Sequence, residues 1–171
     1  KYSTLYAHGS YTGSNGFRDN NNYQKANGIL GGDFKLKNHQ RISTITMATH
    51  LFGQIPSSLD STTFADDPSA AAANWLATEG SEKYTTTLLG LTYKNHFLTD
   101  QNLRLTVSVF NKWRDNFEIR PFNILDERNL SFGLRQELSY SLLHEKNDYI
   151  FKIGTEYQRE YYDWQTFENL N

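Results

Sequence analysis

The residue types that most often perform chemistry are present in this sequence, but they do not form a recognisable catalytic or metal site. The five histidines lie on separate segments and lack the i, i+4 spacing that places two imidazoles on one helix face. There is no cysteine, which excludes disulfides, thiolate metal sites and cysteine nucleophiles. No phosphate-binding glycine loop, dinucleotide fingerprint or serine nucleophile motif occurs. We therefore expect no enzyme, no metal site and no cofactor.

Glu137 and Glu156 are the carboxylates best placed to act as a pair, because they can share one face of adjacent predicted strands. Arg135 and Lys152 lie close to them in the same pattern. Acid–base catalysis by the two carboxylates is one interpretation. A solvated face on which opposite charges pair is the simpler one.

Four arginines fall in the long segments between the predicted strands: Arg18, Arg114, Arg120 and Arg128. A guanidinium group presents its donors in a fixed fork that suits carboxylate and phosphate groups. These residues are therefore candidates for contacts with an anionic ligand. Ordinary loop solvation, or contact with lipid head groups, is the alternative for each of them.

Alternation of apolar and polar residues is the main structural signal. Residues 130–142 are almost wholly apolar at even positions and polar or small at odd positions, which is the pattern of a strand with one buried face. Similar runs, among them one in which Leu88 is out of pattern, predict about seven strands and an all-β fold. The other runs lie at 2–12, 23–36, 41–52, 84–97, 103–109 and 149–158.

The lengths of these runs and of their connections favour a membrane barrel. A strand in a soluble protein is typically about 5–6 residues long, whereas one that crosses a bilayer at a tilt needs about 9–11. Short and long connections also alternate, so an antiparallel up-and-down sheet would have all its long loops at one end, as transmembrane barrels do. A soluble ligand-binding β-barrel or sandwich is the alternative. The short connections are 37–40, 98–102 and 144–148, and the long ones are 12–22, 53–83 and 114–128.

One short helix is predicted inside the long connection 53–83. Asp67 can cap its N-terminus, Pro68 suits the first turn and the alanines at 70–73 propagate the helix. Gly80 is a reasonable stop.

Aromatic residues gather near the predicted strand ends, where the interfacial girdles of a transmembrane barrel would place them. The alternative is that aromatic residues are simply common in strands. The residues concerned are Tyr93, Phe97, Trp113, Phe117, Tyr140, Tyr149, Tyr157, Tyr161, Tyr162 and Trp164.

Composition excludes several classes of protein. The net charge of −2 gives no electrostatic case for a nucleic-acid partner. No segment approaches the 18 or so apolar residues of a transmembrane helix. The chain begins in mid-pattern, without a starting Met or a signal peptide, so we expect it to be a piece of a longer protein.

The stretch from Gly16 to Asn21, followed by Tyr23, resembles the G-[YF]-R-x-N stretch on an early barrel strand of TonB-dependent outer-membrane receptors. The segment 52–68, with Ala71 and Trp75, is similar to the one that follows a long barrel strand in the ferric-siderophore and ferric-citrate branch of that family. Residues 84–93 resemble the family's next strand.

This resemblance implies a barrel of about 22 strands in the outer membrane of a bacterial cell, closed by an N-terminal plug and energised by an inner-membrane TonB complex. Residues 1–171 would be a partial barrel domain without the plug, because about seven strands cannot close such a barrel. The chain also lacks the C-terminal aromatic residue of complete barrels.

The implied function is import of a ferric chelate, either a siderophore or ferric citrate, or of a similar scarce nutrient. The implied partners are that ligand, outer-membrane lipid, the rest of the barrel with its plug, and the TonB complex, but no nucleic acid. On this interpretation we expect ligand contacts first from Arg114 and Arg120, then from Arg18 and Trp75. A passive porin-like barrel is the alternative within the membrane class.

Overall fold

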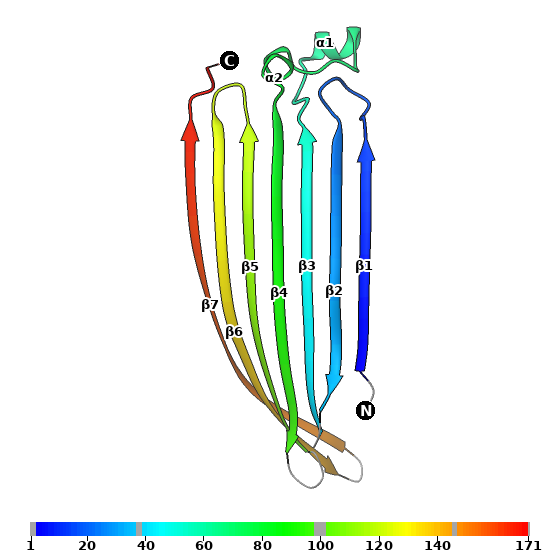
Figure 1. The fold of residues 1–171 in the computed structure, drawn as a ribbon, viewed down its shortest axis with the longest axis vertical. Coiled ribbons are helices and arrows are strands. Elements are labelled where there is room, and N and C mark those ends of the chain that lie inside the picture. The colour runs from blue at the N-terminus through cyan, green and yellow to red at the C-terminus, as the bar shows by residue number, and fades with distance from the viewer. Residues whose placement is uncertain (1–2, 37–38, 98–101, 145–146, 171) are drawn as a thin grey trace.

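The computed structural model describes residues 3–36, 39–97, 102–144 and 147–170. They form one sheet of seven antiparallel strands, in which every strand pairs with its neighbours in the sequence (Figure 1). The prediction of an all-β, up-and-down arrangement is therefore confirmed. The predicted short turns lie partly outside the described residues. The strands are β1 (Ser3–Ser14), β2 (Tyr23–Lys35), β3 (Gln40–Gln54), β4 (Ser81–Phe97), β5 (Leu103–Ile119), β6 (Ile124–His144) and β7 (Asn147–Phe167).

The register gives the sheet an apolar face and a polar face. Residues that pair across antiparallel strands project to the same side, and Val109 of β5 pairs with Leu134 of β6, which pairs with Tyr157 of β7. The apolar face accordingly comprises the odd positions of β1, β4, β5 and β7 and the even positions of β2, β3 and β6. The polar face comprises the opposite positions. Leu88, which was out of pattern, lies on the polar face beside Met47.

Five aromatic residues of β4 to β7 form two partial rows on the apolar face, with Phe132 and Tyr157 between them. The register aligns Phe97, Tyr140 and Phe151 near one end of the sheet, and Trp113 and Tyr161 nearer the other. Ten residues along each strand separate the rows, which corresponds to a rise of about 33 Å. A tilt of about 40° reduces this to about 25 Å, the height of the apolar band in transmembrane barrels.

The apolar face is not covered by any other part of the described chain. Among the residues that the structure describes, Ala71 and Leu125 are the buried hydrophobic ones. Phe132 and Leu134 of β6 each leave 40% of their surface exposed. A closed soluble barrel would bury such residues in its interior, so this open sheet argues against the soluble alternative.

The predicted long connection 114–128 is wrong. β5 continues to Ile119 and β6 starts at Ile124, which leaves only residues 120–123 between them. Asp115 and Arg128 face each other on these strands and form an ion pair at 3.5 Å. The apolar pattern ends level with Trp113 and Tyr161, but the strands continue past these residues with charged side chains. The apolar pattern therefore could not predict the length of the strands.

The connections at 15–22 and 55–80 lie at the same end of the sheet, above β1 to β4 (Figure 1). The longer one holds two short helices, α1 (Ser61–Asp66) and α2 (Ala73–Ala77), not the single helix predicted from Asp67. No helix in the described part of the chain is long and apolar enough to cross a membrane.

Candidate functional site

The candidate site lies at the end of the sheet that bears α1 and α2, where the two longer connections meet the charged ends of β4, β5 and β6. All four residues predicted from the sequence to bind a ligand belong to this end: Arg18, Trp75, Arg114 and Arg120. Their surroundings differ, so each has to be considered separately.

Arg18 links the two longer connections. Its guanidinium group donates hydrogen bonds to the carbonyl oxygens of Ser57 at 2.6 Å, Ala70 at 2.8 Å and Pro56 at 3.4 Å. The backbone N–H of Asp19 also donates to the carbonyl of Ser69 at 2.8 Å. The donors of Arg18 are therefore directed at loop backbone, which makes this residue a support of the site.

Asn20 completes the same junction. Its side-chain amide donates to the carbonyl oxygens of Ile55 and Gly80, both at 2.9 Å. Asn20 adopts a positive φ of 50°, a conformation that Asn tolerates better than most residues. The arginine and asparagine of the stretch that resembled a receptor motif thus hold one loop against another.

Trp75 packs over Gly80 at the start of β4. A Cβ atom at Gly80 would lie 2.3 Å from the Trp75 ring, so only glycine permits this close contact. Trp75 is half-buried, which leaves part of its ring accessible on the loop surface. The expectation that Trp75 contacts a ligand is not tested by this geometry.

Two aspartates shape the longer connection. Asp60 caps α1 by accepting hydrogen bonds from the backbone N–H groups of Thr62 at 3.0 Å and Thr63 at 2.9 Å. These bonds, that of Thr63 foremost, lower the pKa of the Asp60 carboxyl. Asp67, predicted as the N-cap, instead follows α1 and accepts from the backbone N–H of Ser69 at 3.0 Å. The predicted helix is present in part, because α2 lies between Asp67 and Gly80 as expected, but it begins only at Ala73, and a second helix capped by Asp60 precedes it.

Arg114 lies on the polar face of β5, with its guanidinium group 4.7 Å from the centre of the Tyr84 ring. The same group approaches Glu82 at 3.4 Å. Stacking on an aromatic ring fixes the plane of a guanidinium group and leaves its outer edge free to donate. The side chain retains 41% of its surface exposed, so it can reach a ligand.

Arg120 is more enclosed. It forms an ion pair with Glu118, and this interaction raises the pKa of the guanidinium group. Its carbonyl oxygen accepts from the side chain of Asn169 at 2.8 Å, and its backbone N–H donates to Asn123 at 2.9 Å. Arg120 therefore shapes the tight connection between β5 and β6 and offers less free donor surface than Arg114.

The polar face beneath these arginines is rich in hydrogen-bonding groups that sequence reasoning did not single out. Asn116 is buried and donates to Glu127 at 3.0 Å, while its own side-chain oxygen has no partner among the described residues. The side-chain oxygen of Asn129 is likewise buried and unpaired in that part of the chain. The sequence analysis placed Asn116 in a connection and Asn129 outside the predicted runs, so both their polar-face positions and their burial follow from the observed strands and register. Within the described residues, no group of histidines and carboxylates could hold a metal ion.

The arrangement suits binding better than catalysis. Arg114, Asn116 and Asn129 lie on the polar face of β5 and β6. Arg120 lies in the connection between these two strands, and the two interlocked loops lie at the same end of the sheet, above β1 to β4 (Figure 1). Such a surface can recognise a polar ligand. A hydroxyl–imidazole pair, Thr85 and His50 at 2.9 Å, lies on the opposite, apolar face.

No protein-family model and no curated protein matches the sequence. Solved structures match the fold. The ferric citrate transporter FecA in its unliganded form gives a TM-score of 0.77 at 12% identity, over 96% of this chain and 25% of that one. The ferripyoverdine receptor of the outer membrane of Pseudomonas aeruginosa gives 0.74 at 10% identity, over 98% of this chain and 25% of that one. The RagAB peptide transporter gives 0.66 at 13% identity, over 95% and 23%.

All three matched proteins are TonB-dependent receptors. This chain spans about a quarter of the length of each matched structure. At these identities the likeness concerns the fold: the seven strands have the arrangement of part of a TonB-dependent receptor barrel.

Proposed function

We propose that this chain is part of an outer-membrane, TonB-dependent receptor that imports a ferric chelate, such as a siderophore or ferric citrate, or a similar scarce nutrient. The observation that supports this most strongly is the match of nearly the whole chain to one section of such barrels. The exposed apolar face of the long strands independently supports insertion in a bilayer.

On this proposal, residues 1–171 are a partial barrel domain. The apolar face contacts outer-membrane lipid, and the polar face contacts the lumen of the barrel. The rest of the barrel and a plug complete the protein, and an inner-membrane TonB complex supplies the energy. The proposed cargo is inferred from the matched proteins, of which two are named for ferric chelates and one for peptides.

The chemistry of the candidate site favours a chelate over a neutral nutrient. Ferric chelators bind iron through oxygen atoms, and these atoms are good acceptors for a guanidinium group. Arg114 is the proposed direct contact because it is stacked and accessible. Arg120 and Trp75 are proposed contacts at the loop surface, and Arg18 positions the loops above them.

Uptake of labelled ferric citrate and ferric siderophores by iron-starved cells that produce the full receptor tests the proposal. We expect saturable uptake that a protonophore abolishes, because import by this class needs energy, whereas a passive porin continues without it. Uptake that is insensitive to the protonophore would contradict the import function.

The concentration at which uptake is half-saturated tests the residues assigned to the ligand site. Loss of a charge-assisted hydrogen bond costs about 1.5–3 kcal/mol, and because the arginines are partly exposed we expect the lower end, about tenfold weaker binding, for Arg114→Ala and Arg120→Ala. Arg128→Ala is the matched control, because Arg128 lies at a similar height on the opposite face. Wild-type binding by both site variants would refute the assignment.

A further inference from the structure

The charges on the polar face are unevenly distributed along the strands. In the half nearer to α1 and α2, three basic residues accompany four carboxylates. In the half nearer to the short connections, six basic residues accompany four carboxylates. The first set is Lys25, Lys112, Arg114, Glu82, Glu118, Glu127 and Glu160, and the second is Lys35, Arg41, Lys94, Arg104, Arg135, Lys152, Asp33, Glu137, Asp148 and Glu156. In a chain whose net charge is −2, this end of the face therefore carries a net positive charge.

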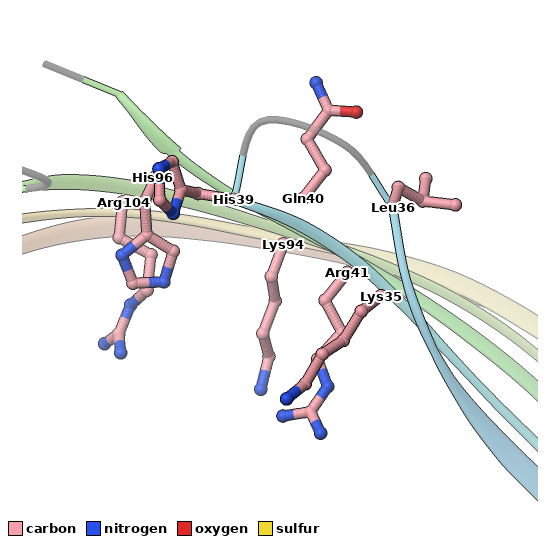
Figure 2. A pocket seen from close by; sticks show the side chains of 8 residues that line it. All are labelled: Lys35, Leu36, His39, Gln40, Arg41, Lys94, His96 and Arg104. Atoms are coloured by element: carbon pink, nitrogen blue, oxygen red, sulfur yellow. The ribbon is translucent and has the colours of Figure 1, made fainter. Parts of the chain in front are cut away.

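The register concentrates part of this excess in one place. Lys35 of β2 pairs with Arg41 of β3, which pairs with Lys94 of β4, and the next strand adds Arg104 beside His96. These five residues, which we call the basic cluster, line a cavity of about 520 Å³. Figure 2 shows the side chains of Lys35, Arg41, Lys94 and Arg104 projecting to the same side of the sheet, whereas Gln40 projects to the other. The volume lies within the usual range of ligand pockets.

The carboxylates nearby do not neutralise the basic cluster. Asp33 pairs with Arg41 at 3.2 Å and also accepts from the Ser43 hydroxyl at 2.5 Å. Glu137 is shared between Arg104 at 3.8 Å and Lys152 at 3.9 Å, which are long distances for ion pairs.

Three donors in the basic cluster lack acceptors. Within the described part of the chain, neither Lys35 nor Lys94 has a carboxylate within 4.0 Å. The Nε–H of Arg104 is buried and has no hydrogen-bond partner there. A buried donor without a partner costs free energy, and adjacent like charges repel each other. An anion in the cavity would relieve the repulsion between the like charges.

We propose that the basic cluster binds a ligand with two or more oxyanion groups, either phosphates or carboxylates. Lysine serves as a point charge for such groups and arginine as a fork of donors. This site lies at the opposite end of the polar face from Arg114, and it does not depend on the import function proposed above.

The test uses the full-length protein that contains this chain, folded in zwitterionic detergent micelles. Binding of sodium tripolyphosphate and of citrate is measured by calorimetry, for wild type and for the double variant Lys35→Gln/Lys94→Gln. We expect saturable binding to wild type and about tenfold weaker binding to the variant. Added salt should weaken the wild-type binding.

The matched control is Lys25→Gln/Lys112→Gln, which removes the same charge from the same face in the other half of the sheet. It should bind the anions as wild type does, and so should the charge-preserving Lys94→Arg. Equal loss in both double variants, or no saturable binding of either probe to wild type, would overturn the proposal. Far-ultraviolet circular dichroism confirms that each variant keeps its strands.

A third arm adds phosphatidylglycerol to the micelles. Competition with tripolyphosphate would support the basic cluster as a site for a lipid phosphate, and lack of competition would support a soluble anion.

Discussion

At the scale of single residues, Arg18 shows how one side chain can hold two loops together. Its three hydrogen bonds reach carbonyl groups 38 to 52 residues further along the chain. We predict that Arg18→Ala frees the connection 55–80 and leaves the sheet intact, because the strand pairing does not involve this residue. Limited proteolysis should show much faster cleavage within 55–80, with unchanged circular dichroism.

Arg128→Ala is the control for this experiment, since it also removes one arginine from the same end of the sheet but makes no contact with these carbonyls. If Arg18→Ala is cleaved no faster than Arg128→Ala, the junction is held by other contacts. In that case Arg18→Ala should also leave ligand binding unchanged, because the role proposed for Arg18 is to position the loops.

At the scale of elements, the short helix α1 depends on its cap. The pKa of Asp60 is lowered below the ordinary value of 3.8 by hydrogen bonds from Thr63 and Thr62 that exist only in the folded loop. A group with a depressed folded pKa stabilises the fold above its unfolded pKa and loses that effect as the pH falls through the folded pKa. We therefore predict that α1 frays below about pH 4. The amides of Thr62 and Thr63 should then lose protection, that is, exchange faster relative to their intrinsic rates at each pH.

Asp60→Asn should remove this pH dependence, because an amide caps a helix without titrating. Asp66→Asn is the matched control: it removes one carboxylate from the same loop and leaves the cap in place. If protection of these amides, relative to their intrinsic exchange rates, stayed constant down to pH 2 in the wild-type chain, the role assigned to Asp60 would be contradicted.

At the scale of the whole molecule, the uncovered apolar face decides what the sheet can contact. Spin labels placed one at a time along β6 in liposomes should report lipid at positions 132, 134 and 138 and water at 131, 135 and 139, because these sets lie on opposite faces. The lipid accessibility of the labels should also change between position 130, which lies level with Trp113 and Tyr161, and the charged start of β6. Lipid contact at the odd positions would reverse the orientation of the sheet and refute the membrane proposal.

The strands and their two faces could be predicted from the sequence, because a period of two residues fixes which side chains share a face once a strand forms. Residues 130–142 are the clearest case, and the observed register agrees with the predicted faces. A helix in the connection 53–83 was predicted, but the start of α2 and the presence of α1 were not, because helices of this length have little stability of their own and form only where tertiary contacts support them.

Contacts between distant residues were decided by the tertiary structure alone. Arg18 was identified from its type, but its partners lie far along the chain, and only the folded loops bring them together. In the same way, the polar-face positions of Lys35, Arg41 and Lys94 follow from alternation, but their alignment across three strands follows from the register. Local sequence therefore determines the face on which each residue lies, and strand pairing determines its neighbours, because hydrogen bonding between strands sets their relative shift.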